Sequence, residues 1–221
     1  LFKIINCLTN YNMSLKYLTY DKINIEDIQL QSYLCDDMSV TKEKDKTYSI
    51  CKDKKCIKDH PCFGYIQLYY HQNPQFLVTT PIMKCLFGIQ NNRNQFSMSL
   101  QFTDLQEDPI MKHFFEFIQN TEFYCMKGLG LTEEDADCFV SQIKYDKKGK
   151  YEPNLNIKLP FHKTSFQTEI ISDHSSNVNL LQIQGFAPMK CDIYLDKIWR
   201  MDINKGHTFH AKWKCKFIHL V

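Results

Sequence analysis

A chain of 221 residues that is 43% hydrophobic and 14% aromatic can bury a substantial core, which excludes a disordered protein. Its formal net charge is only +2, so affinity for a polyanion would require positive charge gathered on one face. No run of 18 apolar residues occurs, which excludes an ordinary membrane-spanning helix, and we expect no membrane partner.

The ten cysteines are scattered, and no complete signal peptide accompanies them, so reduced thiols in a cytosolic or nuclear setting are expected. Four residues of zinc-ligand type lie close together at Cys51, Cys56, His60 and Cys62. Their spacing departs from that of common zinc sites, which favours free thiols and no cofactor. A zinc-stabilised interaction module remains an alternative.

Strand signals dominate the first hundred residues. Aromatic and branched residues are dense in residues 63–71, and shorter apolar runs follow at 76–80 and 82–89. After a turn of asparagines, Phe96, Met98, Leu100 and Phe102 alternate with polar residues, the period of a half-buried strand.

A helical insertion is predicted around residues 108–143. Asp108 and Pro109 form an N-cap followed by proline at the first helical position, and Thr132 with Asp135 resembles a capping box that opens a second short helix. Nine acidic residues face only two lysines between Asp104 and Asp137, so this part is acidic.

Positive charge gathers next, in residues 144–163. Six lysines stand against two acidic residues there, and aromatic residues lie between them. The lysines are Lys144, Lys147, Lys148, Lys150, Lys158 and Lys163, with Tyr145, Tyr151 and Phe161 as the rings. A turn at residues 146–149 and alternation from Leu155 to Phe161 predict a basic, aromatic hairpin, which suits a phosphate backbone and unpaired bases. A solvated turn followed by an ordinary strand is the alternative.

The end of the chain predicts a closing hairpin, with residues 191–201 and 207–221 on either side of a turn at 204–206. In its last strand one face carries Phe209, Ala211, Trp213, Cys215 and Phe217, most simply as core, and the other carries His210, Lys212, Lys214 and Lys216. Lys212 and Lys214 could follow phosphates, as could Lys205 in the turn. Trp199 is a candidate for base stacking, and the adjacent Arg200 is expected to contact DNA as well.

Strands, then a helical insertion, then strands favour a mainly β fold with a helical insertion (α+β), either a barrel or a sandwich. Motifs of P-loop, serine-hydrolase and zinc-protease type are absent from the sequence. Asp104, Glu107 and Asp108 could imitate a nuclease metal site, but a helix cap is the simpler role for Asp108. A metal-dependent nucleic-acid enzyme is therefore an alternative, and no catalytic residue or metal ligand is assigned.

The stretch YEPNLNIKLPF and the closing segment DIYLDKIWRMDINKGHTFHAKWKCKFIHLV resemble single-stranded DNA-binding proteins of nucleocytoplasmic large DNA viruses, which belong with the phage-type OB-fold binding proteins. The specific part covers residues 151–221. The matching positions are Tyr151, Pro153, Leu155, Lys158, Trp199, Gly206 and Trp213; Tyr151, Lys158 and Trp199 are expected to contact DNA.

The resemblance implies an OB-fold-like β-barrel over residues 1–221, with N-terminal elaborations, that coats unpaired DNA in viral replication, repair or recombination without catalysis. Partners would be single-stranded DNA, with RNA as an alternative, viral replication proteins and further copies of the chain. The setting would be the host cytoplasm, with nucleus or virion left open. Phage-type members usually end in an acidic tail, whereas this sequence ends in a basic, apolar strand. Either the tail lies outside the sequence or partner recruitment differs.

Overall fold

The computed structural model describes residues 18–36, 48–50, 64–171, 179–203 and 206–221. Its strands are β1 (Leu18–Thr19), β2 (Ile28–Asp36), β3 (Tyr48–Ile50), β4 (Gly64–Tyr70), β5 (Phe76–Thr79), β6 (Met83–Cys85), β7 (Gln90–Asn92), β8 (Gln95–Gln101), β9 (Ile143–Lys144), β10 (Asn154–Leu159), β11 (Phe161–His162), β12 (Ser165–Phe166), β13 (Glu169–Ile171), β14 (Ala187–Leu195), β15 (Lys197–Ile203), β16 (Gly206–Ala211) and β17 (Lys214–Leu220). The α-helix is α2 (Pro109–Gly128), and the 3₁₀ helices are η2 (Tyr20–Lys22), η3 (Ile25–Asp27), η4 (Glu133–Cys138) and η5 (Leu180–Gln182).

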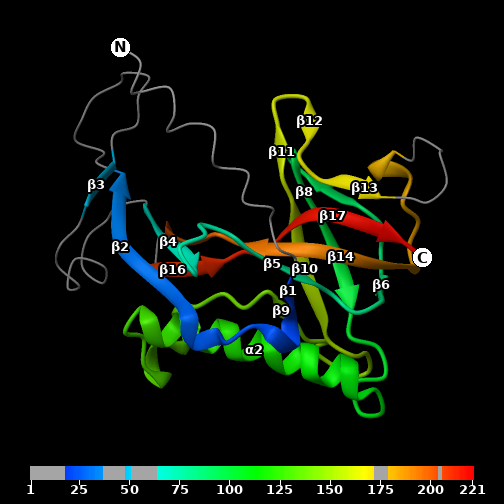
Figure 1. Ribbon diagram of the computed structural model, residues 1–221, viewed down its shortest axis with the longest axis horizontal. Helices are drawn as coiled ribbons and strands as arrows, with labels where there is room; N and C mark the ends of the chain where they lie inside the picture. Colours follow the sequence, from blue (N-terminus) through cyan, green and yellow to red (C-terminus); the bar gives the residue numbers. More distant parts are fainter. Residues whose placement is uncertain (1–17, 37–47, 51–63, 172–178, 204–205) are drawn as a thin grey trace, which may run out of the picture.

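Five strands form a closed ring, in which β6 pairs with β8, β8 with β10, β10 with β17, β17 with β14, and β14 again with β6 (Figure 1). The β10–β17 pair is parallel and the other four are antiparallel. A closed five-stranded barrel with this interrupted strand order has the Greek-key form of the OB fold. The predicted fold class is therefore confirmed.

The barrel core follows from the alternation in the sequence. Met98 and Leu100 on β8 and Leu155 and Ile157 on β10 are fully buried, while the residues between them are half-buried. Trp213 is 0% exposed, and its ring lies 6.3 Å from that of Phe117 on α2, centroid to centroid. The interpretation as core is confirmed for Phe209, Ala211, Trp213 and Cys215, but Phe217 is only half-buried, because the alternation shifts within β17 and Ile218 takes the buried position.

The helix α2 lies between β8 and β10 in the chain and beneath the barrel in Figure 1. Asp108 caps it, since its Oδ1 accepts hydrogen bonds from the backbone N–H groups of Ile110 at 2.8 Å and Met111 at 3.2 Å. The second helix is shorter than expected: the capping box opens the 3₁₀ helix η4, which ends at Cys138. The chain leaves it because the Val140 N–H donates to Phe209 O instead, at 2.9 Å.

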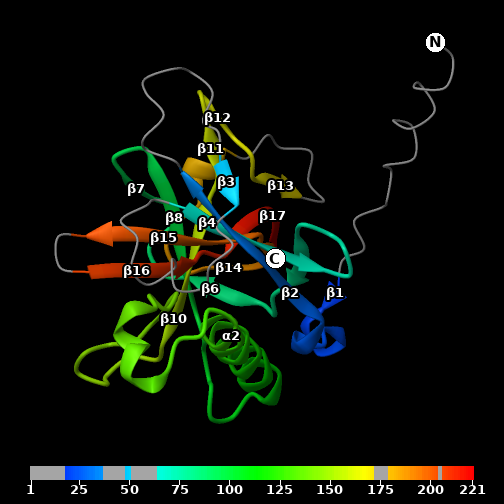
Figure 2. The same cartoon turned by 90° about the vertical axis from the view of Figure 1, so that its left-hand side faces the viewer.

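A second sheet has the order β16–β15–β4–β2–β3. Its β15–β16 hairpin, here called the arm, projects to the left in Figure 2. The arm and the barrel strands β14 and β17 are made from the predicted closing hairpin. The register of Ile203 with Gly206 confirms the reversal, while Asn204 and Lys205 lie outside the described residues. The strands change sheet at Asp196 and again at residues 212–213.

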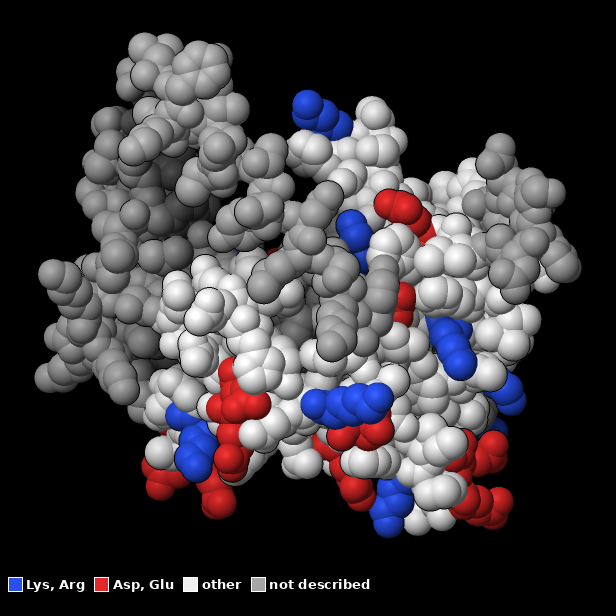
Figure 3. Space-filling model, viewed as in Figure 1, with Lys and Arg blue, Asp and Glu red and all other residues white. Residues whose placement is uncertain are grey.

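On the face drawn in Figure 3, basic and acidic side chains are interspersed, so no continuous surface of one charge forms there. None of the helices in the described ranges combines the length and apolarity needed to cross a membrane.

The role of Asp108 can be tested by Asp108→Ala. The substitution removes the acceptor for two N–H groups at the start of α2 and should lower the free energy of unfolding by about 1 kcal/mol. Urea denaturation measures the change. Glu107→Ala, at an exposed position just before the cap, is the control and should have little effect. Equal stability of both variants would contradict the capping role.

Candidate nucleic-acid interface

The outer surface of the barrel across β8 and β10 carries short polar side chains. Register places Asn156 opposite Ser99 and Lys158 opposite Ser97. The residues that alternate with the buried ones on these two strands include no carboxylate; they are Gln95, Ser97, Ser99, Gln101, Asn154, Asn156 and Lys158. This face presents amide and hydroxyl groups, which can donate and accept hydrogen bonds, together with one ammonium group.

A groove of about 200 Å³ crosses this face and brings distant segments together. It is lined by Asn92, Gln95, Phe96, Ser97, Gln142, Asn156, Lys158 and Lys212. Most of them come from β7, β8 and β10, and Lys212 directly follows the arm; Figure 2 shows β7, β8 and the arm on the same side of the molecule. Two ammonium groups among amides and hydroxyls suit an extended anion that carries hydrogen-bonding groups of its own.

A row of basic side chains includes Lys158 and Lys212, which line the groove, and continues beyond it with Lys144, His210 and Lys214. Partial burial lowers the pKa of His210, and the charges of Lys212 and Lys144 lower it further. Burial lowers the pKa of Lys212, and nearby Lys158 adds to this effect. The pKa of Lys158 is lowered by burial first and then by Lys214. The basic groups therefore lie close enough to repel one another.

One carboxylate balances part of this charge. Asp196 accepts hydrogen bonds from Lys214 Nζ at 2.8 Å and 2.7 Å, one to each oxygen. Its charge also opposes the lowering of the Lys158 pKa. Lys214 is largely neutralised by this pair, which leaves Lys158 and Lys212 with the unbalanced positive charge in the groove.

Aromatic rings lie on the adjoining second sheet. Trp199 pairs across the strands with Tyr65 on one side and His210 on the other. The centroids of the Tyr65 and Trp199 rings are 5.1 Å apart, and Lys197 Nζ lies 4.0 Å from the Tyr65 centroid. His210, the cross-strand partner of Trp199, interacts electrostatically with Lys212, so this ring pair adjoins the basic row. The half-buried rings could stack on planar groups.

The structure brings together only some of the residues singled out from the sequence. Lys158 and Lys212 line the groove, Lys144 lies at one end of the basic row, and Trp199 adjoins that row. Lys214 belongs to the row but is engaged by Asp196.

The predicted hairpin between β9 and β10 is present. Gly149, at φ 65°, donates its N–H to Asp146 O at 3.0 Å to close the turn. The side chains proposed for DNA contact in this loop are all exposed, with Lys150 Nζ 5.1 Å from the Tyr151 ring centroid. They are Tyr145, Lys147, Lys148, Lys150 and Tyr151. Their contact with DNA stays a prediction.

Three other predicted residues lie elsewhere. Lys163 lies in the turn of the β11–β12 hairpin, beyond the opposite end of β10 from the β9–β10 loop. Arg200 is 3% exposed, so the prediction that it contacts DNA is not supported: neighbours on a strand face opposite sides, and Arg200 faces inward where Trp199 faces outward. Lys205 lies outside the described residues.

Sequence reasoning missed several residues of this face. Asn156 and Ser97 could have been found, because each alternates with core residues on a strand that was predicted. Gln142, Tyr65 and Lys197 could not, since their places depend on which strands pair, and that information is not local.

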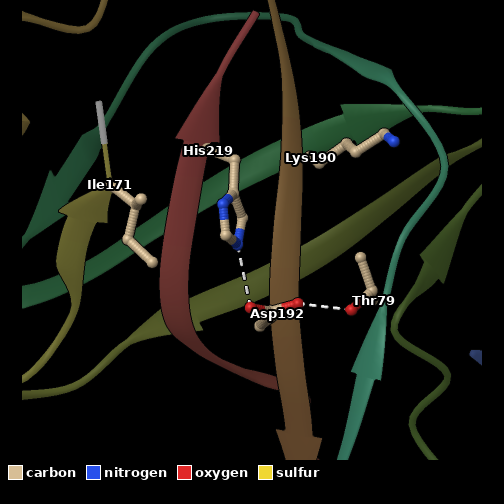
Figure 4. Close-up of a pocket in the computed structure, with 5 residues that line it drawn as sticks. All are labelled: Thr79, Ile171, Lys190, Asp192 and His219. Atoms are coloured by element: carbon tan, nitrogen blue, oxygen red, sulfur yellow. Dashed lines mark hydrogen bonds and ion pairs between the residues drawn. The ribbon is translucent and has the colours of Figure 1, made fainter. Parts of the chain in front are cut away.

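A second pocket of about 330 Å³ is lined by Thr79, Ile171, Lys190, Asp192 and His219 (Figure 4). The buried Asp192 carboxylate lies between its partners, with Thr79 Oγ1 at 2.5 Å and His219 Nε2 at 2.8 Å. Because the Thr79 hydroxyl donates to Asp192 and not to the imidazole, this is not the arrangement that activates a nucleophile.

The alternatives that involve metals receive no support within the described ranges. No group of three histidine, cysteine or acidic side chains there could hold a metal ion. Asp108 caps α2, and the Asp104 backbone oxygen accepts hydrogen bonds from the N–H groups of Glu107 and Asp108. Cys51, Cys56, His60 and Cys62 lie outside the described residues.

No protein-family model matches the chain. No curated protein matches it either. Among solved structures, the single-stranded DNA-binding protein from bacteriophage Enc34 shares 11% identity over 70% of this chain and 83% of its own, with a TM-score of 0.40. The single-stranded DNA-binding protein gp2.5 of bacteriophage T7 shares 11% identity over 66% of this chain and 86% of its own, with a TM-score of 0.41. At these scores the likeness carries no weight, and the fold is assigned from strand pairing.

The crowded lysines predict a measurable cost to stability. Because the folded-state pKa values of Lys158 and Lys212 are depressed, the cost of charging them in the folded protein is absent above the ordinary value of 10.5 and is present in full once pH has fallen through the folded-state values. At neutral pH both are charged and oppose folding. Lys158→Met and Lys212→Met should therefore raise the free energy of unfolding near neutral pH, and the gain should shrink in alkaline buffer. Urea denaturation at both pH values measures it.

Lys147→Met is the control for these two variants. Its side chain is exposed in the β9–β10 loop, so its charge carries no burial cost and stability should be unchanged. A loss of stability in the Lys158 and Lys212 variants would contradict the proposed repulsion.

Proposed function

We propose that this protein binds single-stranded DNA without regard to sequence and without catalysing a reaction. The observation that carries the proposal is the groove on the outer face of β8 and β10, where Lys158 and Lys212 stand among amide and hydroxyl groups. In OB folds the face of the second and third strands, with the loops after the first and fourth, is where oligonucleotides bind. Here those strands are β8 and β10, and those connections contain β7 and the arm.

The charges of the groove favour a phosphate backbone. Lys158 and Lys212 repel each other while half-buried, and a phosphate between them would offset that repulsion. Binding would also release the counterions that surround DNA, which supplies most of the affinity in such proteins. Lys144 and the loop residues Lys147, Lys148 and Lys150 would extend these contacts beyond one end of β10, and Lys163 could do so beyond the other.

The rings and amides favour unpaired bases. Trp199 with Tyr65 offers a stacking surface beside the groove, and Tyr145 and Tyr151 are exposed at the edge of the β9–β10 loop. Stacking accepts any base, because every base has a flat face. Serine, asparagine and glutamine side chains can donate or accept, so they impose little preference among bases.

The biological setting rests on sequence resemblance to the single-stranded DNA-binding proteins of nucleocytoplasmic large DNA viruses, and especially to the African swine fever virus member. We include in the proposal that the protein coats unpaired DNA during viral replication, repair or recombination in the cytoplasm of the host cell. Viral replication proteins and further copies of the chain are its proposed protein partners.

Competition binding tests the proposal directly. Labelled oligo-dT should bind, and unlabelled single-stranded DNA should displace it far better than duplex DNA does. An RNA competitor, measured in the same way, shows how RNA affinity compares with the other two. The double variant Lys158→Gln, Lys212→Gln should reduce the slope of log affinity against log salt by about 1.4, since each phosphate contact on a single strand contributes about 0.7. Lys112→Gln, on the exposed side of α2, should leave the slope unchanged. Equal competition by duplex DNA, or an unchanged slope in the double variant, would refute this interface.

The ring pair is tested separately with Trp199→Ala. Loss of one stacked base should weaken oligo-dT binding by about 1–3 kcal/mol. Fluorescence anisotropy at fixed salt measures the affinity. Phe123→Ala removes an exposed aromatic ring from α2, away from the groove, and should not affect binding. If the two variants bind alike, Trp199 does not belong to the site.

A further inference from the structure

A short segment, residues 139–144 and here called the strap, joins the arm to the barrel. At its start Phe139 bridges to Phe209 on β16, and the Val140 N–H donates to Phe209 O at 2.9 Å. At its end β9 pairs with β10, and the Asn156 N–H donates to Gln142 O at 2.9 Å. The strap thus ties β16 of the arm to β10, in addition to the direct pairing of β10 with β17.

One buried carboxylate on α2 is hydrogen-bonded to the strap. Glu122 on α2 is 7% exposed, and it accepts hydrogen bonds from Ser141 Oγ at 2.6 Å and from the Gln142 N–H at 2.7 Å. Burial raises the pKa of Glu122, while these two hydrogen bonds and the charge of Lys144 act in the opposite direction. A buried carboxylate is costly to keep, so its two donors matter for the local structure.

The strap is also ordered by its own side chains. Gln142 Nε2 donates to Val140 O at 3.0 Å, and Lys144 Nζ donates to Ser141 O at 2.6 Å. Gln142 lines the groove, and Lys144 begins the basic row. The two residues held by Glu122, Ser141 and Gln142, therefore connect the helix to the proposed DNA site.

We infer that Glu122 is a positioning residue for single-stranded DNA, a conclusion that rests on the proposed function. It contacts no ligand itself. By fixing the strap it holds Gln142 in the groove and ties β16, which carries His210, to Asn156 on β10. A groove already arranged for its ligand binds more tightly, because less order has to be imposed on binding.

Substitution of Glu122 tests this inference. Glu122→Ala leaves the Gln142 N–H without its acceptor and should weaken oligo-dT binding by about tenfold, because the groove is no longer pre-arranged. The salt slope should match that of the wild type, since no phosphate contact is removed. Glu122→Gln should restore binding, because its amide oxygen can accept from the Gln142 N–H and its NH₂ group can donate to Ser141 Oγ.

Two further variants separate positioning from general stability. Met111→Ala shortens another buried side chain of the same helix, about three turns away from Glu122, and it should lower the free energy of unfolding without weakening oligo-dT binding. Ser141→Ala removes one donor while leaving α2 intact and should weaken binding two- to fivefold, about half the effect of Glu122→Ala on a logarithmic scale. It serves as the test if Glu122→Ala fails to fold.

Amide hydrogen exchange supplies the structural readout, since exchange at Gln142 and Ile143 should accelerate in Glu122→Ala and in Ser141→Ala. Wild-type affinity in a folded Glu122→Ala protein, or in Ser141→Ala, would overturn the inference. So would a loss of binding in Met111→Ala equal to that in Glu122→Ala. A wild-type protein that fails to bind oligo-dT would instead refute the proposed function, so the two failures can be told apart.

Discussion

The parallel pairing of β10 with β17 is the contact on which the rest of this molecule depends. It closes the barrel, and the Lys158 N–H donates to Trp213 O at 2.9 Å across the seam. The same pairing sorts the side chains: Trp213 enters the core, while Lys158 and Lys214 stand opposite each other on the outer surface. Closing the fold and gathering the positive charge are therefore one structural event.

Gathering that charge has a cost, and the structure offsets only part of it. Asp196 lies at the corner where the chain passes from barrel to arm, and its bidentate pair with Lys214 ties that corner to β17. Lys158 and Lys212 keep depressed pKa values, which means that the folded protein holds charges it would be more stable without. Residues that lower the stability of the fold tend to mark functional sites, where a bound ligand compensates the unfavourable interaction.

Local patterns in the sequence were enough to predict much of the framework. Alternation identified β8, β10 and most of the core row from Phe209 to Phe217, because one buried face forces a period of two. The Asp108 cap followed from its side-chain chemistry and the proline after it. The same alternation places Arg200 on the opposite face of the strand from Trp199. The prediction that both residues contact DNA did not take this into account. Only part of the candidate site could be predicted from the sequence. Lys158 and Lys212 lie on predicted strands, whereas Gln142 and Tyr65 reach it through strand pairings that no short window of sequence contains.

In the proposed function, the barrel supplies polar and basic groups and the second sheet supplies aromatic rings, and this arrangement would favour unpaired bases over a duplex. Duplex DNA presents only the edges of its bases, within the grooves, and its base faces are stacked on one another. The Tyr65 and Trp199 rings have value only for a strand whose bases are free to turn outward, while the amide and hydroxyl groups of β8 and β10 can meet whichever edge is presented. Lysines alone would bind either form, since both carry phosphates. If the protein binds single-stranded DNA as proposed, discrimination would come from the rings of the second sheet, with the strap holding the arm beside the barrel.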